Sequence, residues 1–297
     1  MKKIGVIGLG NMGMGIAKNL IKDGYDTTGF DLRESCLKEL INNGGNAAES
    51  VEKVGEICDV AFVMVMNGAQ VEDVVTKLSP GLKNKGTIIV TATITPEEVK
   101  KAYKIAQKSN IKMIDSPVSG GLQGAHEGTL TLMSAAENEV LNNCKNILES
   151  ISKDIFHVGI NIGDGQTVKA SLQVFIGATF TAIFESLVLG AKAGIDGKIL
   201  YDVFSSSGVS SPLFKNCAKL IMDRKFENTG SHISTMYKDL GISMDMAKQN
   251  GVPMFTAAAA FELFQAGISM YPEGDNWSIV KLLEKMADTK VEWKNNN

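Results

Sequence analysis

Gly8-Leu9-Gly10-Asn11-Met12-Gly13 is the stretch that decides the fold, because it connects the short apolar run of residues 4–8 to a segment with helical periodicity. In a strand-turn-helix unit of this kind, the first glycine permits the tight turn, the second lets the main chain approach a pyrophosphate, and the third lets the helix pack closely on the strand. The free N–H groups at the start of the helix then bind the phosphate without basic side chains. The stretch therefore predicts a dinucleotide-binding unit; the simpler alternative is a glycine turn without a ligand.

Asp31 indicates which dinucleotide is bound. It ends the second predicted strand, residues 27–31, and stands eighteen residues after Gly13. A carboxylate at this position accepts hydrogen bonds from the hydroxyl groups of the adenosine ribose, and its charge repels a 2′-phosphate. The expected cofactor is NAD, while the neighbouring Arg33 weakens this preference and keeps NADP possible.

Strand and helix patterns alternate from residue 3 to about residue 135. Short apolar runs are followed by amphipathic segments such as residues 96–107, in which Pro96 suits the first helical turn. This alternation is typical of α/β proteins with an open, mainly parallel sheet. The predicted strands are residues 4–8, 27–31, 60–65, 87–90, 112–115 and 130–134.

The second half of the chain begins with a long apolar helix. Between Lys169 and Lys192 the single charged residue is Glu185, so this helix is apolar around most of its circumference and about 35 Å long. A membrane span of that length is conceivable. Scattered polar residues such as Gln173 instead favour a helix buried at a domain junction or at a subunit interface.

The change of pattern near residue 160 divides the 297 residues into two predicted domains, 1–162 and 163–297. After this boundary the apolar residues recur only with the spacing of an α-helix, which predicts an all-helical second domain. Its further helices are predicted at residues 196–204, 212–222, 238–249, 256–266 and 275–287.

Charge and cysteine content exclude several classes of protein. Thirty basic against thirty-three acidic side chains give a net charge of −3, which provides no general attraction for nucleic acid or for an anionic membrane. The four cysteines lie far apart without a C-x-x-C pair, and the chain has three histidines. This pattern predicts neither a disulfide framework nor a metal site, and reduced thiols indicate the cytoplasm.

A second glycine-rich segment, Asp115-Ser116-Pro117-Val118-Ser119-Gly120-Gly121, ends a predicted strand and starts a predicted helix. The hydroxyl of Ser119 and the N–H groups of Gly120 and Gly121 would form a compact pocket for a carboxylate. An ordinary turn at the exit of a strand explains the segment equally well.

A third segment, Gly163-Asp164-Gly165-Gln166-Thr167-Val168-Lys169, opens the long apolar helix. Lys169 and Gln173 are four residues apart, so they share one face of this helix. Partial burial would destabilise the charged amine of Lys169 and allow it to exchange a proton near neutral pH. The alternative is a lysine whose amine reaches solvent while its stem packs on the helix.

These three segments, in this order and together with Lys238-Asp239-Leu240, resemble the β-hydroxyacid dehydrogenase family. The family includes 3-hydroxyisobutyrate dehydrogenases, tartronate semialdehyde reductases and threonate dehydrogenases, and the resemblance runs from residue 3 to about residue 287. It implies an N-terminal Rossmann-type doubly wound sheet, an all-helical C-terminal domain and a long helix shared by both. It also implies a nicotinamide cofactor between the domains and a small hydroxy acid as substrate.

The resemblance gives each segment a role. Lys169 corresponds to the catalytic general acid/base, and Gln173 to the residue that orients the reacting hydroxyl. The substrate carboxylate would be bound by Ser119, Gly120 and Gly121. For the remaining positions the resemblance implies Val65 and Met66 at the adenosine ribose, Thr93 near the nicotinamide, Lys238 closing over cofactor and substrate, and a structural Asp239.

Two departures from the family pattern point to a substrate. Gln173 stands where the family commonly has asparagine, and Val65-Met66 replaces the usual Leu-Pro. Both look most like the threonate dehydrogenase branch, whose members oxidise four-carbon sugar acids. Ser210, in the serine-rich stretch 205–211, is a further candidate for contact with a polyhydroxy substrate. The alternative there is a helix-helix turn with an N-cap before Pro212.

Other functions stay open at this stage. A 3-hydroxyisobutyrate dehydrogenase, or a tartronate or succinic semialdehyde reductase, would use the same residues. A decarboxylating sugar-phosphate dehydrogenase is less favoured, because the sequence has no cluster of arginine and histidine for a phosphate. From a different class, a dinucleotide-binding protein without catalysis would need neither Lys169 nor the pocket at Ser119. The long apolar helix predicts a homodimer or a homotetramer.

Overall fold

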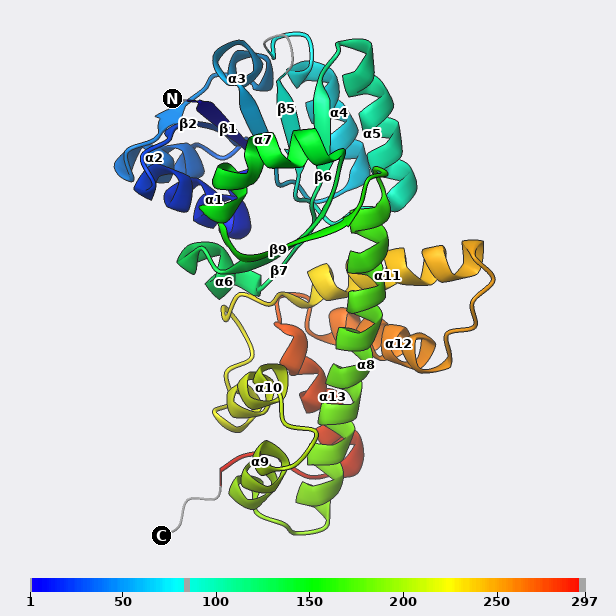
Figure 1. Ribbon diagram of the computed structural model, residues 1–297. Coiled ribbons are helices and arrows are strands. Elements are labelled where there is room, and N and C mark those ends of the chain that lie inside the picture. The colour runs from blue at the N-terminus through cyan, green and yellow to red at the C-terminus, as the bar shows by residue number, and fades with distance from the viewer. Residues whose placement is uncertain (1, 83–85, 294–297) are drawn as a thin grey trace. The chain divides into compact units, whose positions relative to one another are not determined.

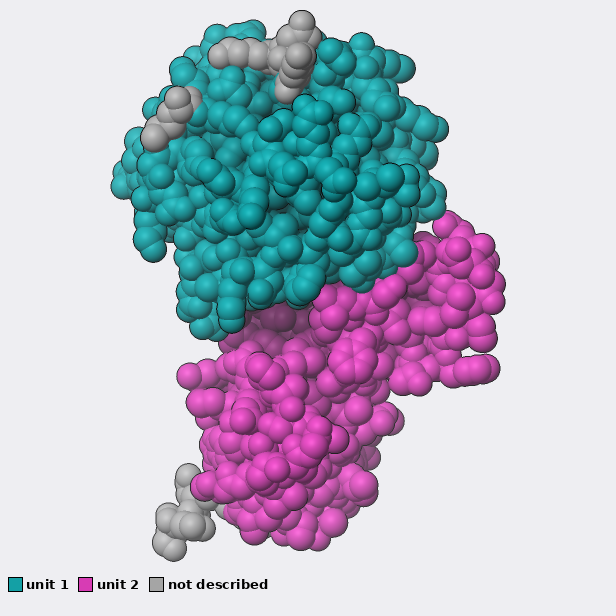
Figure 2. Space-filling view, viewed as in Figure 1, with its two compact units in different colours: residues 1–169 teal, residues 170–297 magenta. Residues whose placement is uncertain are grey.

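The computed structural model describes residues 2–82 and 86–293 (Figure 1). The chain divides into two compact units, Met1–Lys169 and Ala170–Asn297, which Figure 2 distinguishes by colour. The division falls inside one long helix, α8 (Asp164–Lys192). The first turns of this helix, up to Lys169, therefore belong to the first unit.

The first unit is built on one sheet, to which nine strands of the described residues contribute. The strands follow the order β3-β2-β1-β4-β5-β6-β8-β7, and β9 pairs with β8. Neighbours from β3 to β6 are parallel, whereas β8 runs antiparallel to β6 and β7 and parallel to β9. The bounds are β1 (Lys3–Ile7), β2 (Asp26–Phe30), β3 (Asn46–Ala47), β4 (Val60–Val63), β5 (Thr87–Val90), β6 (Lys112–Asp115), β7 (Val118–Ser119), β8 (Leu130–Ala135) and β9 (Ser152–Gly159).

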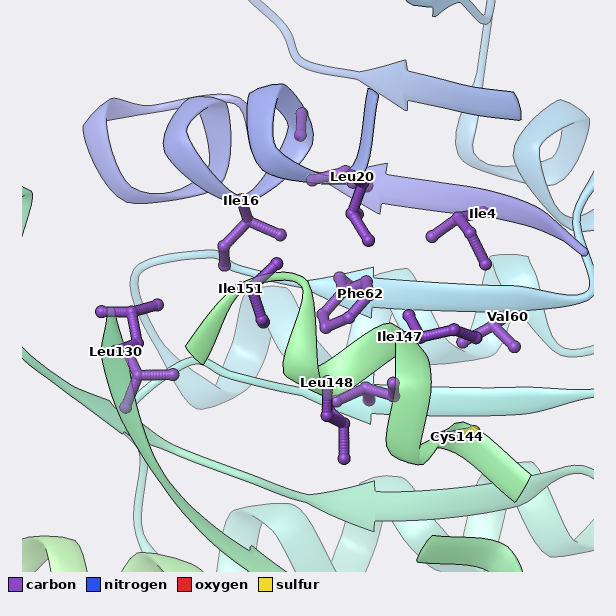
Figure 3. Packing of buried hydrophobic residues seen from close by; sticks show 14 of the residues in the cluster. Ile4, Ile16, Leu20, Val60, Phe62, Leu130, Cys144, Ile147, Leu148 and Ile151 are labelled. Carbon is purple, nitrogen blue, oxygen red and sulfur yellow. The ribbon is translucent and has the colours of Figure 1, made fainter. Parts of the chain in front are cut away.

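Helices cover both faces of the parallel strands (Figure 1). Successive strand residues point to opposite faces, so Val6 lies in a core with α1 and α7 while Ile7 lies in a second core with α3, α4 and α5. Figure 3 shows Leu20 of α1 and Ile147 of α7 turned toward Phe62 of β4. The helices of this unit are α1 (Asn11–Lys22), α2 (Glu34–Asn42), α3 (Val51–Ile57), α4 (Gly68–Leu78), α5 (Pro96–Lys108), α6 (Gly121–Glu127) and α7 (Asn138–Glu149).

Helix α6 packs against α1 at very short range. A Cβ atom on Gly15 would lie 2.7 Å from the main-chain carbon and oxygen of Ala125, so a larger residue would push the helices apart. The buried side chain of Asn19 joins the same helices, because its Nδ2 donates to the carbonyl oxygens of Gly15 (2.9 Å) and Ala125 (2.8 Å). The position of α6, which starts at Gly121, is therefore fixed against the helix that follows the first glycine motif.

In the described residues of the second unit the regular elements are helices, with one isolated bridge between His232 and Asp275. Phe180 and Phe184 of α8 are buried and stacked with ring centroids 6.0 Å apart, and Phe180 also contacts Phe264 and Trp277. In the described chain α8 is the one helix that is long and apolar enough to cross a membrane, and these buried aromatic contacts identify it as a core helix of this unit. The other elements are α9 (Gly197–Ser206), α10 (Pro212–Met222), α11 (Ile233–Gln249), α12 (Phe255–Met270), the short 3-10 helix η1 (Asn276–Ser278) and α13 (Ile279–Ala287).

The α/β class, the doubly wound sheet and the helical second half are confirmed, and so are the six predicted strands, with ends that shift by at most two residues. Three strands were not predicted. Strands β3 and β7 have two residues each, too few for a pattern. Strand β9 is largely solvent-exposed and contains Lys153, Asp154 and His157, so no apolar run marks it.

Three predicted helix boundaries were wrong. The helix expected over residues 256–266 continues to Met270. The helix expected from residue 238 begins at Ile233, where His232 caps it by accepting the N–H of Ser234 at 3.2 Å. The helix expected over residues 275–287 begins as η1 and continues as α13. Asp275 stays outside it, because its carboxylate accepts the N–H groups of Thr229 and Ser231.

Candidate active site

The turn from β1 to α1 has the compact geometry expected of the first glycine motif. Gly8 adopts a positive φ of 89°, which favours glycine, and its N–H donates to the carbonyl of Phe30 at 2.9 Å. A Cβ atom on Gly13 would lie 1.8 Å from the carbonyl oxygen of Gly8. No other residue type therefore fits at Gly13 in this backbone.

The start of α1 fits a pyrophosphate. Gly10 is the N-cap residue, and no side chain caps the helix there. A Cβ atom on Gly10 would meet nothing closer than the Arg33 guanidinium at 3.4 Å, so a ligand can approach the main chain closely. Uncapped N–H groups at the start of a helix bind phosphate oxygens well, and NAD(P) would be held here by the main chain of residues 10–13.

Asp31, directly after β2, is tied to the same turn. Its Oδ2 accepts the N–H of Leu9 at 2.8 Å, and the Arg33 side chain binds both carboxylate oxygens at 3.0 and 3.1 Å. Burial alone would raise the pKa of the Asp31 carboxyl, but the hydrogen bonds from Arg33 and Leu9 outweigh it and hold the pKa below its usual value. Asp31 is therefore charged at neutral pH and points at the turn where a ribose would lie. Leu9 contributes its N–H, while its side chain is buried in the core.

The other predicted cofactor residues follow the neighbouring strands. Val65 and Met66 come after β4, and Thr93 comes after β5, each close to the carboxyl end of its strand. Because β2, β1, β4 and β5 are adjacent and parallel, these residues share one edge of the sheet with Gly8 and Asp31. Met66 is exposed and Thr93 half-buried. The structure thus gathers these predicted cofactor residues of the first unit at one edge, and their individual contacts remain predictions.

The predicted carboxylate pocket lies between β7 and α6. Ser119 is half-buried at the end of β7, where it pairs with Thr131 of β8. Gly120 and Gly121 follow with φ values of 129° and 61°, so the main chain turns sharply and both residues are exposed. The two glycines thereby leave their main chain open to solvent, as the predicted anion site requires.

Lys169 lies on α8 with 6% of its surface exposed, and Gln173, one turn further along, is equally buried. The two side chains share one face of the helix. A lysine amine in such surroundings is poorly hydrated, which suits a group that must exchange a proton. The catalytic role of Lys169 and the substrate contact of Gln173 stay predictions.

Gln173 is held within the second unit by Asp239 of α11. The amide nitrogen Nε2 of Gln173 lies 2.6 Å from Oδ2 of Asp239, and Nζ of Lys238 lies 3.0 Å from Oδ1 of the same carboxylate. The buried carboxylate thus brings together two predicted site residues, Gln173 and Lys238.

Ser210 lies in the turn between α9 and α10, where its N–H donates to the carbonyl of Ser207 at 3.0 Å. The next residue, Ser211, caps α10 by accepting the N–H of Phe214 at 3.1 Å. The capping turn considered in the sequence is therefore present at Ser211. A substrate contact of Ser210 stays a prediction.

Asp115 and Gln166 belong to the second and third motifs, and the sequence alone assigns no function to either side chain. The carboxylate of Asp115 and the side chain of Gln166 are both buried and lie 2.9 Å apart. The signal available in the sequence was the polar Asp115 at the end of an apolar strand, since a buried carboxylate needs partners.

Two family models match the chain. The NAD binding domain of 6-phosphogluconate dehydrogenase matches residues 3–159, and the NAD-binding region of NADP-dependent 3-hydroxyisobutyrate dehydrogenase matches residues 163–283. Together they span the sheet, the long helix and most of the helical unit.

Known proteins resemble the chain over nearly its full length. It is 34% identical over 294 residues to the 2-(hydroxymethyl)glutarate dehydrogenase of Eubacterium barkeri, covering 97% of each protein. It is 30% identical over 285 residues to the L-threonate dehydrogenase of Cupriavidus necator, covering 95% of this chain and 96% of that one. The crystal structure of 3-hydroxyisobutyrate dehydrogenase from Salmonella typhimurium matches with a TM-score of 0.88 at 28% identity, covering 95% of this chain and 100% of the other.

The geometry of the site and the similar proteins both indicate a nicotinamide-dependent dehydrogenase. The glycine turn and Asp31 fit a dinucleotide, and both family models describe the binding of a nicotinamide cofactor. The relatives named above are dehydrogenases that align with nearly the whole chain. The chain thus belongs to the β-hydroxyacid dehydrogenase family and is an NAD(P)-dependent hydroxyacid dehydrogenase.

Proposed function

We propose that the enzyme interconverts a small hydroxy acid and its oxo acid, with Lys169 as the residue that transfers the proton. The observation that carries this proposal is the placement of Lys169 and Gln173, both 6% exposed, on one face of α8. A buried amine and a buried amide one turn apart can bind a hydroxyl group and remove its proton. The cofactor, when bound, supplies the acceptor for the hydride.

Other residues of the chain bind the substrate and orient its hydroxyl group. The hydroxyl of Ser119 and the main chain at Gly120 and Gly121 hold the substrate carboxylate. One N–H of the Gln173 amide is donated to Asp239, which leaves its second N–H to donate to the oxygen of the substrate hydroxyl. Nζ of Lys169, neutral at the start, takes the proton of this hydroxyl and returns it in the reverse reaction. Most of the acceleration then comes from positioning and proton transfer.

The first test removes the amine of Lys169. Lys169→Ala should lower kcat by about a hundredfold or more, the usual size of a lost general base, and should leave the Kd for NAD(P) within about threefold. Lys192→Ala, at the exposed end of the same helix, is the matched control. A Lys169→Ala enzyme that keeps more than about a tenth of the wild-type rate would refute the assignment.

The substrate we place first is a four-carbon sugar acid such as threonate. Gln173 and the Val65-Met66 pair support this choice, as does the 30% identity to an L-threonate dehydrogenase. A second candidate, 2-(hydroxymethyl)glutarate, is supported by the 34% identity to the dehydrogenase of that name. Steady-state kcat/KM values for threonate, erythronate, 2-(hydroxymethyl)glutarate, 3-hydroxyisobutyrate and tartronate semialdehyde, each with NAD and with NADP, decide between them. A preference for any of the last three would reject the sugar acid.

A homodimer or homotetramer is the expected assembly. Phe175 and Leu189 of α8 are 69% and 72% exposed, and fourteen residues place them on nearly the same side of the helix. Large apolar side chains exposed together are typical of a subunit interface. Light scattering should therefore give a mass of two or four chains, reduced in Phe175→Glu. A monomeric wild-type enzyme would contradict this part of the proposal.

The proposed location is the cytoplasm. All four cysteines are free thiols, as expected in a reducing compartment. Alkylation of the denatured protein directly after cell lysis should modify all four, and mass spectrometry would reveal any disulfide.

A further inference from the structure

The side-chain amide of Gln166 contacts two other segments of the first unit. It is 1% exposed, and its Nε2 donates to the carbonyl oxygen of Ala92 at 3.0 Å and to Oδ1 of Asp115 at 2.9 Å. Its Oε1 accepts the N–H of Ile94 at 3.1 Å. A glutamine amide has two N–H groups and one carbonyl, so each polar group of this side chain has a partner. The side chain is therefore held in one orientation.

The two main-chain bonds of Gln166 lie on either side of Thr93. The carbonyl of Ala92 and the N–H of Ile94 belong to the peptide groups before and after this residue, and both point to the same amide. This segment continues beyond the end of β5. The amide of Gln166 supplies the hydrogen-bond donor and acceptor that a neighbouring strand would otherwise supply. The position of Thr93 depends on Gln166.

The main chain of Gln166 also fixes the start of α8. Its N–H donates to Oδ2 of Asp115 at 3.3 Å, and the N–H of Gly163 donates to the same oxygen at 2.8 Å. The buried carboxylate at the end of β6 therefore takes up N–H groups of the helix terminus. Lys169 lies three residues after Gln166 on this helix.

We propose that Gln166 is a positioning residue of the reaction: its amide sets the place of Thr93, and with it the nicotinamide, relative to the amine of Lys169. The inference rests on the proposed roles of Thr93 and Lys169. Hydride and proton leave neighbouring atoms of the substrate, so their two acceptors must keep a fixed separation. Displacing a reacting group by about 1 Å can lower a rate about a hundredfold. A hydrogen-bonded amide fixes this separation more strictly than apolar packing, which tolerates sliding.

The test replaces the amide and keeps its volume. Gln166→Met removes all three side-chain hydrogen bonds, and Gln166→Glu keeps the shape but places a carboxylate against Asp115 and the carbonyl of Ala92. Gln107→Met, at an exposed position of α5, is the control. We expect each Gln166 variant to lose at least about tenfold in kcat and to show a larger primary isotope effect with substrate deuterated at the reacting carbon, because misplacement slows the transfer itself.

Binding of ADP-ribose separates this role from a general effect on folding. ADP-ribose lacks the nicotinamide, so its Kd should stay within about threefold of the wild-type value while NADH binds more weakly. A Gln166→Met enzyme with kcat within about threefold of wild type would overturn the proposal. So would a parallel loss of ADP-ribose binding and activity in both variants. If Lys169→Ala abolishes turnover and Gln166→Met does not, this inference fails and the proposed function stands; an active Lys169→Ala enzyme rejects the proposed function itself.

Discussion

The amide nitrogen of Gln173 lies 2.6 Å from Oδ2 of Asp239, and both side chains are buried in the helical unit. A hydrogen bond to a charged carboxylate is shorter and stronger than one between neutral groups. It fixes the orientation of the Gln173 amide, with the nitrogen toward Asp239. The reach of the longer glutamine, in place of the family's asparagine, is thus matched by a partner on α11.

Asp239→Asn should weaken this arrangement without creating a large cavity. We expect kcat for the preferred hydroxy acid to fall about tenfold to a hundredfold, the equivalent of about 1.5 to 3 kcal/mol for a hydrogen bond to a charged group. Cofactor affinity should change less than kcat, although the same carboxylate also pairs with Lys238. Steady-state kinetics check this, with Asp245→Asn on the exposed side of the same helix as control. An unchanged kcat would mean that the bond serves stability only.

The pair formed by Asp31 and Arg33 predicts how cofactor choice can be altered. Asp31→Ala removes the acceptor for the ribose hydroxyls, so the Kd for NAD should rise about tenfold or more while that for NADP rises less. Arg33→Ala should weaken NADP and leave NAD within about threefold. Fluorescence titrations with NADH and NADPH measure both, and Lys38→Ala, an exposed position of α2, is the control. Equal effects on both cofactors would argue against this reading of the pair.

Asp115 predicts a pH dependence of stability. Burial raises the pKa of its carboxyl from 3.8 to about 6, in spite of the hydrogen bonds that it accepts from Gly163 and Gln166. The folded chain thus binds this proton more tightly than the unfolded chain, so the stabilisation is complete below about pH 4 and is lost as the pH rises through 6. The free energy of unfolding of the wild type relative to Asp115→Asn should therefore fall by about 2 kcal/mol between pH 4 and pH 7. Urea unfolding at several pH values measures it, and a constant difference would contradict the prediction.

The contact between α1 and α6 predicts a loss of stability on adding one methyl group. Gly15→Ala places a Cβ atom 2.7 Å from the main chain of Ala125, which cannot move without shifting α6. We expect a loss of about 1 to 3 kcal/mol, the usual cost of overpacking, visible as a lower melting temperature. Gly208→Ala is the control, because nothing lies within 4 Å of its added Cβ atom. Equal melting temperatures for the two variants would show that α6 can shift away from α1 at little cost in stability.

The main strands could be predicted because each is an apolar run that crosses the interior. Residues 87–90 and 112–115 are examples that match the structure residue for residue. Strand β9 could not be predicted, because it pairs with β8 while seven of its eight residues are exposed or only half-buried. The start of α11 depends on His232 as a cap, a role for which serine, threonine or aspartate is the usual signal.

The glycine turn and Asp31 could be recognised because they belong to one strand-helix-strand unit, β1-α1-β2, with a known spacing. The role of Gln166 could not be recognised in the same way. Its partners, Ala92 and Ile94, stand 74 and 72 residues away in the sequence, and only the folded sheet brings them together. Sequence patterns report which side chains are buried, whereas the partners of a buried amide follow from the tertiary structure.

The 1.8 Å between the carbonyl oxygen of Gly8 and a Cβ atom at Gly13 has a genetic consequence. Every amino acid other than glycine carries a Cβ atom, so every missense change in the codon for Gly13 introduces the same overlap, whatever the new side chain. In a library of all single variants scored by growth on the substrate, this codon should tolerate synonymous changes alone. Gly208, with open space around it, should accept most of the other amino acids.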